Sequence, residues 1–242
     1  GVDEDIQPLP YEDSPPIPSV LNARSRPTVL LFVWNIPHYR APIYRRLSRN
    51  PTLQFTVCAG AETHLFDGGI LATAGETRAL EGIRWRPLRS VRVRRGPFKG
   101  YEWQPEAFRI VRRENIDAVI SFGIKSFSNY LIRMVCAIRG IPLLEWSQGL
   151  KRPERGLKWS LRKLYMKQAD ALLLYGSFAR DFFVAHGFDE KRVFVVRNSL
   201  DHDAQVRFRE QLTSDDLRRT RESLDVRDAG QRLIIHSGRL EP

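Results

Sequence analysis

The chain has 242 residues, with 39 lysines and arginines against 28 aspartates and glutamates, which gives a formal net charge of +11 at pH 7. This length and balance are typical of a globular α/β protein with one large or two small domains, and the positive charge favours anionic partners. Its two cysteines, Cys58 and Cys136, are too few for a disulfide scaffold and too widely spaced for a zinc site. No apolar run reaches the roughly 18 to 20 residues of a membrane-spanning helix.

Residues 1–26 differ in composition from the rest of the chain. They contain five prolines and five acidic residues and little periodic apolar pattern. Segments of this kind bury too little apolar surface to fold, and this one lacks the features of a signal peptide. We expect a flexible acidic and proline-rich arm over 1–26.

From Thr28 onward, short apolar runs alternate with helical patterns. The runs predict strands over 28–34, 54–60, 82–88, 117–123, 141–147, 170–176, 192–198 and 232–238. The intervening patterns predict helices over 41–49, 103–114, 126–139, 156–168, 177–186 and 214–224. Such alternation is the signature of βαβ units. The sequence therefore predicts an α/β fold, a Rossmann-like parallel sheet with helices on both faces.

Two of these helices have clear local signals at their ends. Ser177 is expected to cap the helix over 177–186, and Gly187 to end it. Ser214 with Asp215 is expected to cap the helix over 214–224.

In a doubly wound sheet, ligands bind outside the carboxyl ends of the strands. After the first strand come His38, Tyr39 and Arg40, followed by Pro42, which is suited to the start of a helix. A helix N-terminus beside an arginine and a histidine makes a good anion site. The alternative is that these side chains only pack the turn.

Polar, glycine-bearing turns also follow two later strands. Gly123 and Lys125 follow the strand over 117–123, and Ser147, Gln148 and Gly149 follow the strand over 141–147. Each turn is a weak signal alone, but all of them are predicted to lie at one edge of the sheet. We expect them to contribute to substrate binding.

The most one-sided segment runs from Arg84 to Lys99 and contains no acidic residue. Its basic residues are Arg84, Arg86, Arg89, Arg92, Arg94, Arg95 and Lys99. One interpretation is a solvated loop, and the other is a docking surface for anionic lipid or a lipid-phosphate acceptor. The helix over 156–168 adds a basic outer face, which suits a helix that covers the sheet or one that lies on a membrane.

Several enzyme classes lack their motifs in this sequence. There is no G-x-G-x-x-G after the first strand, no Walker A loop and no G-x-S-x-G elbow. The five histidines show no H-x-x-x-H or H-E-x-x-H spacing, so no metal site is expected. These observations argue against nicotinamide-dependent dehydrogenases, P-loop enzymes, α/β-hydrolases and metalloenzymes.

The segment from Ala169 to Asp201, together with the end of the chain, resembles the signature of family 4 glycosyltransferases. The matching residues are Gly187, Lys191, Val193, Val195, Asn198, Leu200, Asp201, Gly238, Arg239 and Leu240. The opening "LLFVWNIPHYRAPIYRRLSR" is also similar to the first strand and helix of many members that act on bacterial surface polysaccharides. The resemblance covers about 28–242.

This resemblance implies a GT-B fold, in which two Rossmann-like domains face each other. Residues 27–230 correspond to the N-terminal acceptor-binding domain, and 231–242 to the first strand of a truncated donor-binding domain. Gly238 and Arg239 match the turn that holds the donor diphosphate, and Asn198 is carried over as a substrate-binding residue. The resemblance further implies a retaining transfer from a nucleotide-sugar co-substrate, with no cofactor and no metal.

The sequence departs from the family pattern at two places. Gln148 stands where many relatives have a histidine, and an amide can hydrogen-bond a sugar hydroxyl but cannot serve as an acid or base. The family's paired glutamates belong to the donor-binding domain, so the catalytic residues are not assigned. We expect this chain alone to bind acceptor without transferring sugar.

Two functional interpretations follow. The first is the acceptor-binding half of a glycosyltransferase that acts on a lipid-linked or glycan acceptor in cell-envelope or exopolysaccharide synthesis. We expect it in the cytoplasm, with peripheral attachment to the inner face of the cell membrane as an open alternative. The second is a non-catalytic module that binds an anionic lipid, glycan or protein. Nucleic acid is not an expected partner, because no base-reading module is recognisable. The donor, acceptor, linkage and oligomeric state are not assigned.

Overall fold

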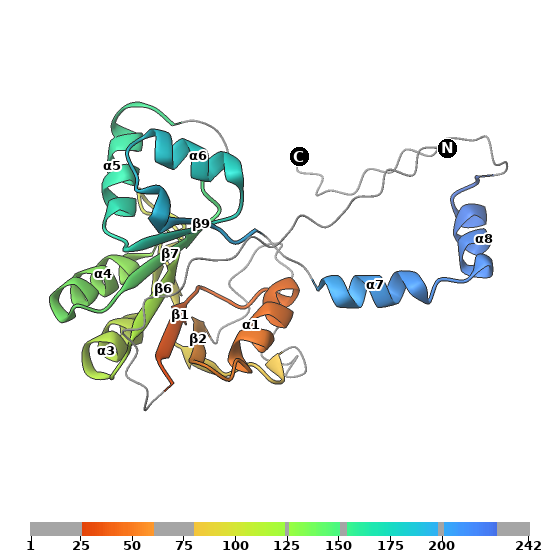
Figure 1. The fold of residues 1–242 in the computed structure, drawn as a ribbon, viewed down its shortest axis with the longest axis horizontal. Helices are drawn as coiled ribbons and strands as arrows, with labels where there is room; N and C mark the ends of the chain where they lie inside the picture. The colour runs from red at the N-terminus through yellow and green to blue at the C-terminus, as the bar shows by residue number, and fades with distance from the viewer. Residues whose placement is uncertain (1–25, 61–79, 124–125, 151–153, 198–200, 227–242) are drawn as a thin grey trace.

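The computed structural model describes residues 26–60, 80–123, 126–150, 154–197 and 201–226. Their centre is a parallel sheet of seven strands in the order β3-β2-β1-β6-β7-β8-β9 (Figure 1). These strands are β1 (Thr28–Phe32), β2 (Gln54–Gly60), β3 (Trp85–Leu88), β6 (Ala118–Phe122), β7 (Leu143–Ser147), β8 (Ala171–Leu174) and β9 (Val193–Val195). The sheet confirms the predicted Rossmann-like α/β class.

The central strand β1 shows why the apolar runs are continuous. Leu31 lies opposite Val57 of β2 on one side and Ile120 of β6 on the other. Both faces of this strand are covered, so Leu30, Leu31 and Phe32 are all buried. Strands buried on both faces are apolar at every position, which is the pattern that the sequence displays.

Helices cover both faces of the sheet. Helix α1 (Ala41–Ser48) packs on one face, where Tyr44 contacts the same apolar cluster as Val57 and Trp146. Four helices lie on the opposite face: α3 (Pro105–Arg113), α4 (Phe127–Arg139), α5 (Gly156–Lys167) and α6 (Ser177–Ala185). The chain therefore changes direction across the sheet at β1, because β2 and β6 flank β1 on opposite sides.

The amino ends of the strands are tied together by aspartates. The Asp117 carboxylate accepts a hydrogen bond from the Thr28 backbone N–H at 2.6 Å, and the Asp170 carboxylate accepts one from the Leu143 N–H at 2.8 Å. These bonds satisfy backbone donors where the ladders begin. Aspartate side chains thus satisfy two backbone N–H groups at the amino edge of the sheet.

A short hairpin, which the sequence analysis did not predict, joins β3 to α3. It pairs β4 (Val91–Arg92) with β5 (Glu102–Trp103) in antiparallel register. Buried Gln104 follows it, and its side-chain amide donates to the Val33 carbonyl oxygen at 3.1 Å and to Ser90 Oγ at 2.9 Å. Two-residue strands carry no periodicity that could be recognised in the sequence.

The last described helices stand apart from the sheet (Figure 1). Helix α7 (His202–Glu210), which was not predicted, and helix α8 (Ser214–Ser223) contain no buried residue. Helix α7 has only a weak apolar pattern, and the Asp201 side chain at its N-cap, accepting from the Ala204 N–H, was the available signal.

The predicted caps are shifted by one residue. Helix α8 begins at a capping box formed by Thr213 and Asp216, with Ser214 as its first helical residue. Helix α6 has Gly176 at its N-cap, with no side-chain bond from Ser177. Gly187 follows the C-cap with a φ of +85°, as a helix-ending glycine does.

Three predictions fall outside the described residues. They are the arm over 1–26, of which only Arg26 is described, the strand over 232–238 and the domain boundary at 230/231. None of the described helices has the length and apolar character required to cross a bilayer.

Phe183 of α6 tests the core on the four-helix face. Its ring is 0% exposed, whereas Phe178 on the same helix is 57% exposed. We expect Phe183→Ala to lower the free energy of unfolding by about 3–5 kcal/mol, because it leaves a cavity. Phe178→Ala should change it by less than about 0.5 kcal/mol. Urea denaturation measures both, and equal effects would contradict this packing.

Candidate functional site

The carboxyl ends of three adjacent strands bring together six of the nine predicted substrate-binding residues. Tyr39 and Arg40 follow β1, Gly123 follows β6, and the segment 147–149 ends and follows β7. Because β1, β6 and β7 are neighbours in the sheet, these turns share one edge. We call this edge, defined by 34–40, 122–123, 146–149 and 175–176, the carboxyl edge.

Arg40 is the centre of an aromatic cluster at the carboxyl edge. Its guanidinium carbon lies 4.8 Å from the Trp146 ring centroid and 5.1 Å from the centroids of both Phe122 and Tyr175. Tyr39 is a fourth ring, at 5.8 Å. The arginine is only 3% exposed, so the ring faces take over part of the role of water in stabilising its charge.

Two polar groups of this aromatic cluster have no hydrogen-bond partner among the described residues. They are Nε1 of Trp146 and the hydroxyl of Tyr175, and both atoms are buried. A buried donor without a partner costs free energy, so each such atom needs an explanation. Among the described residues, Trp85 Nε1, Arg133 Nε and Glu145 Oε1 are also buried without a partner. A ligand hydroxyl or phosphate oxygen could accept from either Trp146 Nε1 or the Tyr175 hydroxyl.

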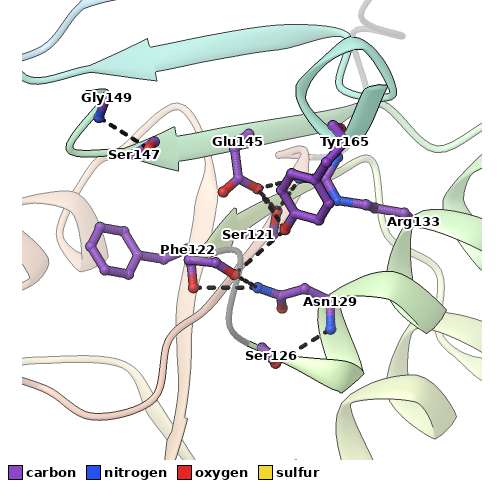
Figure 2. Close-up of polar contacts among 10 residues, drawn as sticks. Ser121, Phe122, Ser126, Asn129, Arg133, Glu145, Ser147, Gly149 and Tyr165 are labelled. Carbon is purple, nitrogen blue, oxygen red and sulfur yellow. Dashed lines mark hydrogen bonds and ion pairs between the residues drawn. The ribbon is translucent and has the colours of Figure 1, made fainter. Parts of the chain in front are cut away.

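The turns after β6 and β7 are held by short polar contacts (Figure 2). The Asn129 side-chain amide donates to the Gly123 carbonyl oxygen at 2.7 Å, and Ser147 Oγ accepts from the Gly149 N–H at 3.1 Å. Gly149 has a φ of +77°, and a Cβ there would lie 2.4 Å from the Cβ of Ala179. Glycine is therefore required where this turn meets α6.

A buried ion pair supports the carboxyl edge from the four-helix face. A guanidinium nitrogen of Arg133 in α4 contacts Glu145 Oε2 in β7, and both side chains are at most 2% exposed. Ser121 Oγ donates to the same oxygen at 2.5 Å. The Arg133 guanidinium also lies 3.7 Å from the Tyr165 ring centroid and donates to the Tyr165 carbonyl oxygen at 3.2 Å (Figure 2).

Burial is the main cause of the shifted pKa values in this cluster. It raises the pKa of Glu145, against the opposing effects of Arg133, of Ser121 and of a backbone hydrogen bond from Gly123. Burial also raises the pKa of Tyr165, and the nearby Glu145 charge adds to that effect. The cluster joins two strands and two helices.

The basic residues of 84–99 are divided between two parts of the fold. Arg84 and Arg86 lie near the amino edge, where Arg86 pairs with Glu114 at 2.7 Å. Arg92 lies in β4, and Arg89 is exposed just before it. The exposed hairpin turn carries Arg94, Arg95 and Lys99. The hairpin as a whole, Arg92 included, lies near the carboxyl edge, because Glu102, the strand partner of Arg92, bridges to Ser126 at the start of α4.

Several predicted site residues lie outside the description. These are Lys125, Asn198, Gly238, Arg239 and the side chain of His38. Gln148 is placed and exposed at the carboxyl edge.

Sequence reasoning missed the aromatic partners of Arg40 and the Arg133–Glu145 pair. Phe122, Trp146 and Tyr175 each stand at the end of an apolar run, which is the position where ligands are expected. Glu145 interrupts the apolar run "LLEW", and a charged residue inside a buried strand signals a buried partner. Metal independence stays a prediction; the described residues contain no cluster of three or more metal-binding side chains.

Arg133→Met leaves the Glu145 carboxyl buried without its cation. We expect the free energy of unfolding at neutral pH to fall by about 3–5 kcal/mol. The guanidinium lowers the pKa of Glu145, so the variant raises that pKa further above its unfolded value. A carboxyl whose pKa is raised in the folded state stabilises the fold at low pH and destabilises it as the pH rises. The deficit should therefore grow as the pH rises from acid to neutral values.

Urea denaturation over this pH range measures the effect. The double variant Arg133→Met/Glu145→Leu is the control, because it removes both charges and should recover most of the stability at every pH. A pH-independent deficit shared by both variants would contradict the assignment.

Comparisons with known proteins agree with this architecture. A glycosyltransferase from Rickettsia africae superposes with a TM-score of 0.54 at 16% identity, over 84% of this chain and 51% of that one. A UDP-GlcNAc 2-epimerase from Neisseria meningitidis, bound to UDP-GlcNAc, gives 0.51 at 12% identity, over 82% and 54%. The chain thus spans about half the length of these structures, and the likeness shows the fold.

No curated protein sequence matches the chain. The sequence model of Glycosyltransferase Family 4, in contrast, matches residues 53–204, from β2 to α7. This match covers more than half of the chain and includes the turns after β6 and β7. The chain therefore belongs to Glycosyltransferase Family 4, and its sheet is the predicted Rossmann-like half of a GT-B fold.

Proposed function

We propose that this chain is the acceptor-binding half of a glycosyltransferase that uses a nucleotide sugar as donor. The observation that best supports this proposal is the buried Arg40 among aromatic rings at the carboxyl edge, in a member of Glycosyltransferase Family 4. Ligands of open α/β sheets bind at this edge. At the amino edge, the carboxylates of Asp117 and Asp170 are instead hydrogen-bonded to backbone N–H groups.

The chemistry of the carboxyl edge suits a saccharide with an anionic group. Aromatic rings bury the apolar face of a sugar, while polar tips and amides hydrogen-bond its hydroxyls. Half-exposed Tyr39, exposed Gln148 and the unpartnered donors of Trp146 and Tyr175 supply these groups. The positive charge of Arg40, which is buried among the same rings, favours a phosphate or carboxylate on the acceptor.

The donor side of the proposal rests on the family resemblance. Gly238 and Arg239 would hold the donor diphosphate, and cationic groups would stabilise the charge that develops on the leaving nucleotide. The epimerase of similar fold binds UDP-GlcNAc, which supports a nucleotide sugar here. The proposed reaction retains anomeric configuration, needs no metal and serves cell-envelope or exopolysaccharide synthesis at the inner face of the membrane.

Arg40→Met tests the acceptor assignment. It preserves side-chain length but removes the charge under the rings, so we expect the affinity for a short polyprenyl-phosphate-linked saccharide to fall by about tenfold. Arg46→Met is the matched control, because Arg46 is an exposed residue of α1, the helix that Arg40 precedes, and its replacement should leave affinity unchanged. Isothermal titration calorimetry measures both, with circular dichroism to verify folding.

Equal affinities for the two variants would contradict the assignment. A second assay supplies labelled UDP- and GDP-sugars with the same saccharide. We expect binding of the saccharide without transfer by these 242 residues. Sustained transfer by this chain alone would contradict the division of labour between the two domains.

A further inference from the structure

Helices α4 and α5 share an outer surface that no other described element covers. It presents six large apolar side chains that are between 43% and 76% exposed. They are Tyr130, Met134, Ile138, Leu157, Leu161 and Leu164. Single exposed apolar residues are common on proteins, but a contiguous group of this size marks an interaction site.

The spacing places each set of three on one side of its helix. The α4 residues are four positions apart, and the α5 residues are four and three apart, so each set forms a stripe. The two helices are direct neighbours, because the rings of Tyr130 and Tyr165 lie 5.2 Å apart and Arg133 of α4 bonds the Tyr165 carbonyl (Figure 1). We call the two stripes together the α4–α5 surface.

The β4–β5 hairpin extends this surface beyond the N-terminus of α4. Phe98, which is 52% exposed, lies 5.5 Å from Phe127, the first residue of α4. The same hairpin turn carries exposed Arg94, Arg95 and Lys99. An aromatic ring among cations therefore stands at the end of the apolar stripes.

Charge around the α4–α5 surface has one sign. Neither helix contains an acidic residue. Lys158 and Lys167 flank the leucine stripe on its two sides, as the helical repeat of 3.6 residues requires. Glu154, which precedes α5, forms ion pairs with Arg162 at 2.7 Å and with Lys158 at 2.8 Å.

We propose that the α4–α5 surface and the hairpin turn dock on an anionic lipid bilayer. Apolar side chains at helix-stripe spacing enter the boundary between headgroups and acyl chains, while flanking lysines bind anionic headgroups. A second copy of this chain fits poorly, since the cationic flanks of two copies would face each other. The leucine stripe and the lysines beside it thus both favour an anionic bilayer as the partner.

Docking in this way places the carboxyl edge close to the headgroups. The hairpin bridges to Ser126, which directly follows the turn after β6 at that edge. A lipid-borne substrate would then reach the carboxyl edge without leaving the membrane. The docking itself does not depend on the proposed function, and its test contains no sugar.

Flotation of the 242-residue chain with vesicles is the first test. We expect binding to vesicles of phosphatidylcholine with phosphatidylglycerol, and weak binding to phosphatidylcholine alone. The triple variant Leu157→Ser/Leu161→Ser/Leu164→Ser should weaken binding by on the order of 100-fold. Lys158→Gln/Lys167→Gln should weaken it by roughly 30-fold and reduce its salt dependence.

The matched control is Leu212→Ser/Leu217→Ser/Leu224→Ser, which removes three exposed leucines of the α7–α8 segment. It should leave vesicle binding unchanged. Absence of binding to the phosphatidylglycerol vesicles, or equal losses in both leucine variants, would overturn the proposal. So would a dimer, seen by sedimentation, that the first leucine variant abolishes while vesicle binding persists.

A fluorescent probe locates the contact directly. The native thiols are buried, and burial raises the pKa of Cys58 to about 12 and of Cys136 to about 11, so an introduced exposed cysteine labels selectively. An environment-sensitive dye on Leu161→Cys should shift to the blue with anionic vesicles, whereas the same dye on Leu217→Cys should not. A shift at the second position only would overturn the proposal.

Discussion

The buried ion pair between Arg133 and Glu145 holds together the elements that form both the carboxyl edge and the α4–α5 surface. It joins α4 to β7, and its contacts with Ser121 and Tyr165 add β6 and α5. A charged pair without water is stable only when both partners stay in place, since removal of one leaves an uncompensated charge. The turns after β6 and β7 and the α4–α5 surface are consequently held in one arrangement.

A second buried guanidinium, that of Arg40, lies on the opposite face of the sheet among aromatic rings. The two arginines differ in their surroundings: Arg133 is paired with a carboxylate, while Arg40 is packed against ring faces. Buried atoms without a partner among the described residues occur in both places, at Trp146 and Tyr175 beside Arg40 and at Arg133 Nε and Glu145 Oε1 within the ion pair. The first arrangement is that of a structural support. The second lies at the edge where α/β sheets bind ligands, and it is the centre of the proposed acceptor site.

The sequence predicted the fold well because parallel strands that are buried on both faces produce unmistakable apolar runs, as at Leu30, Leu31 and Phe32. Edge residues such as Tyr39, Arg40 and Gly149 were found because strand ends are visible in the sequence. The aromatic partners of Arg40 were missed because they come from three strands whose adjacency is a property of the sheet order alone. Half of the α4–α5 surface could be predicted from the sequence, as a basic amphipathic helix over 156–168. The stripe on α4 could not, because only the folded structure shows that α4 packs beside α5.

The central claim is that the carboxyl edge binds the acceptor of a Glycosyltransferase Family 4 enzyme. Hydrogen–deuterium exchange with and without a short polyprenyl-phosphate-linked saccharide tests it most directly. The account predicts protection of peptides that contain 34–40, 122–123, 146–149 and 175–176, with peptides at the amino edge around Asp117 and Asp170 unchanged. Protection at the amino edge, or none at the carboxyl edge under saturating ligand, would contradict it.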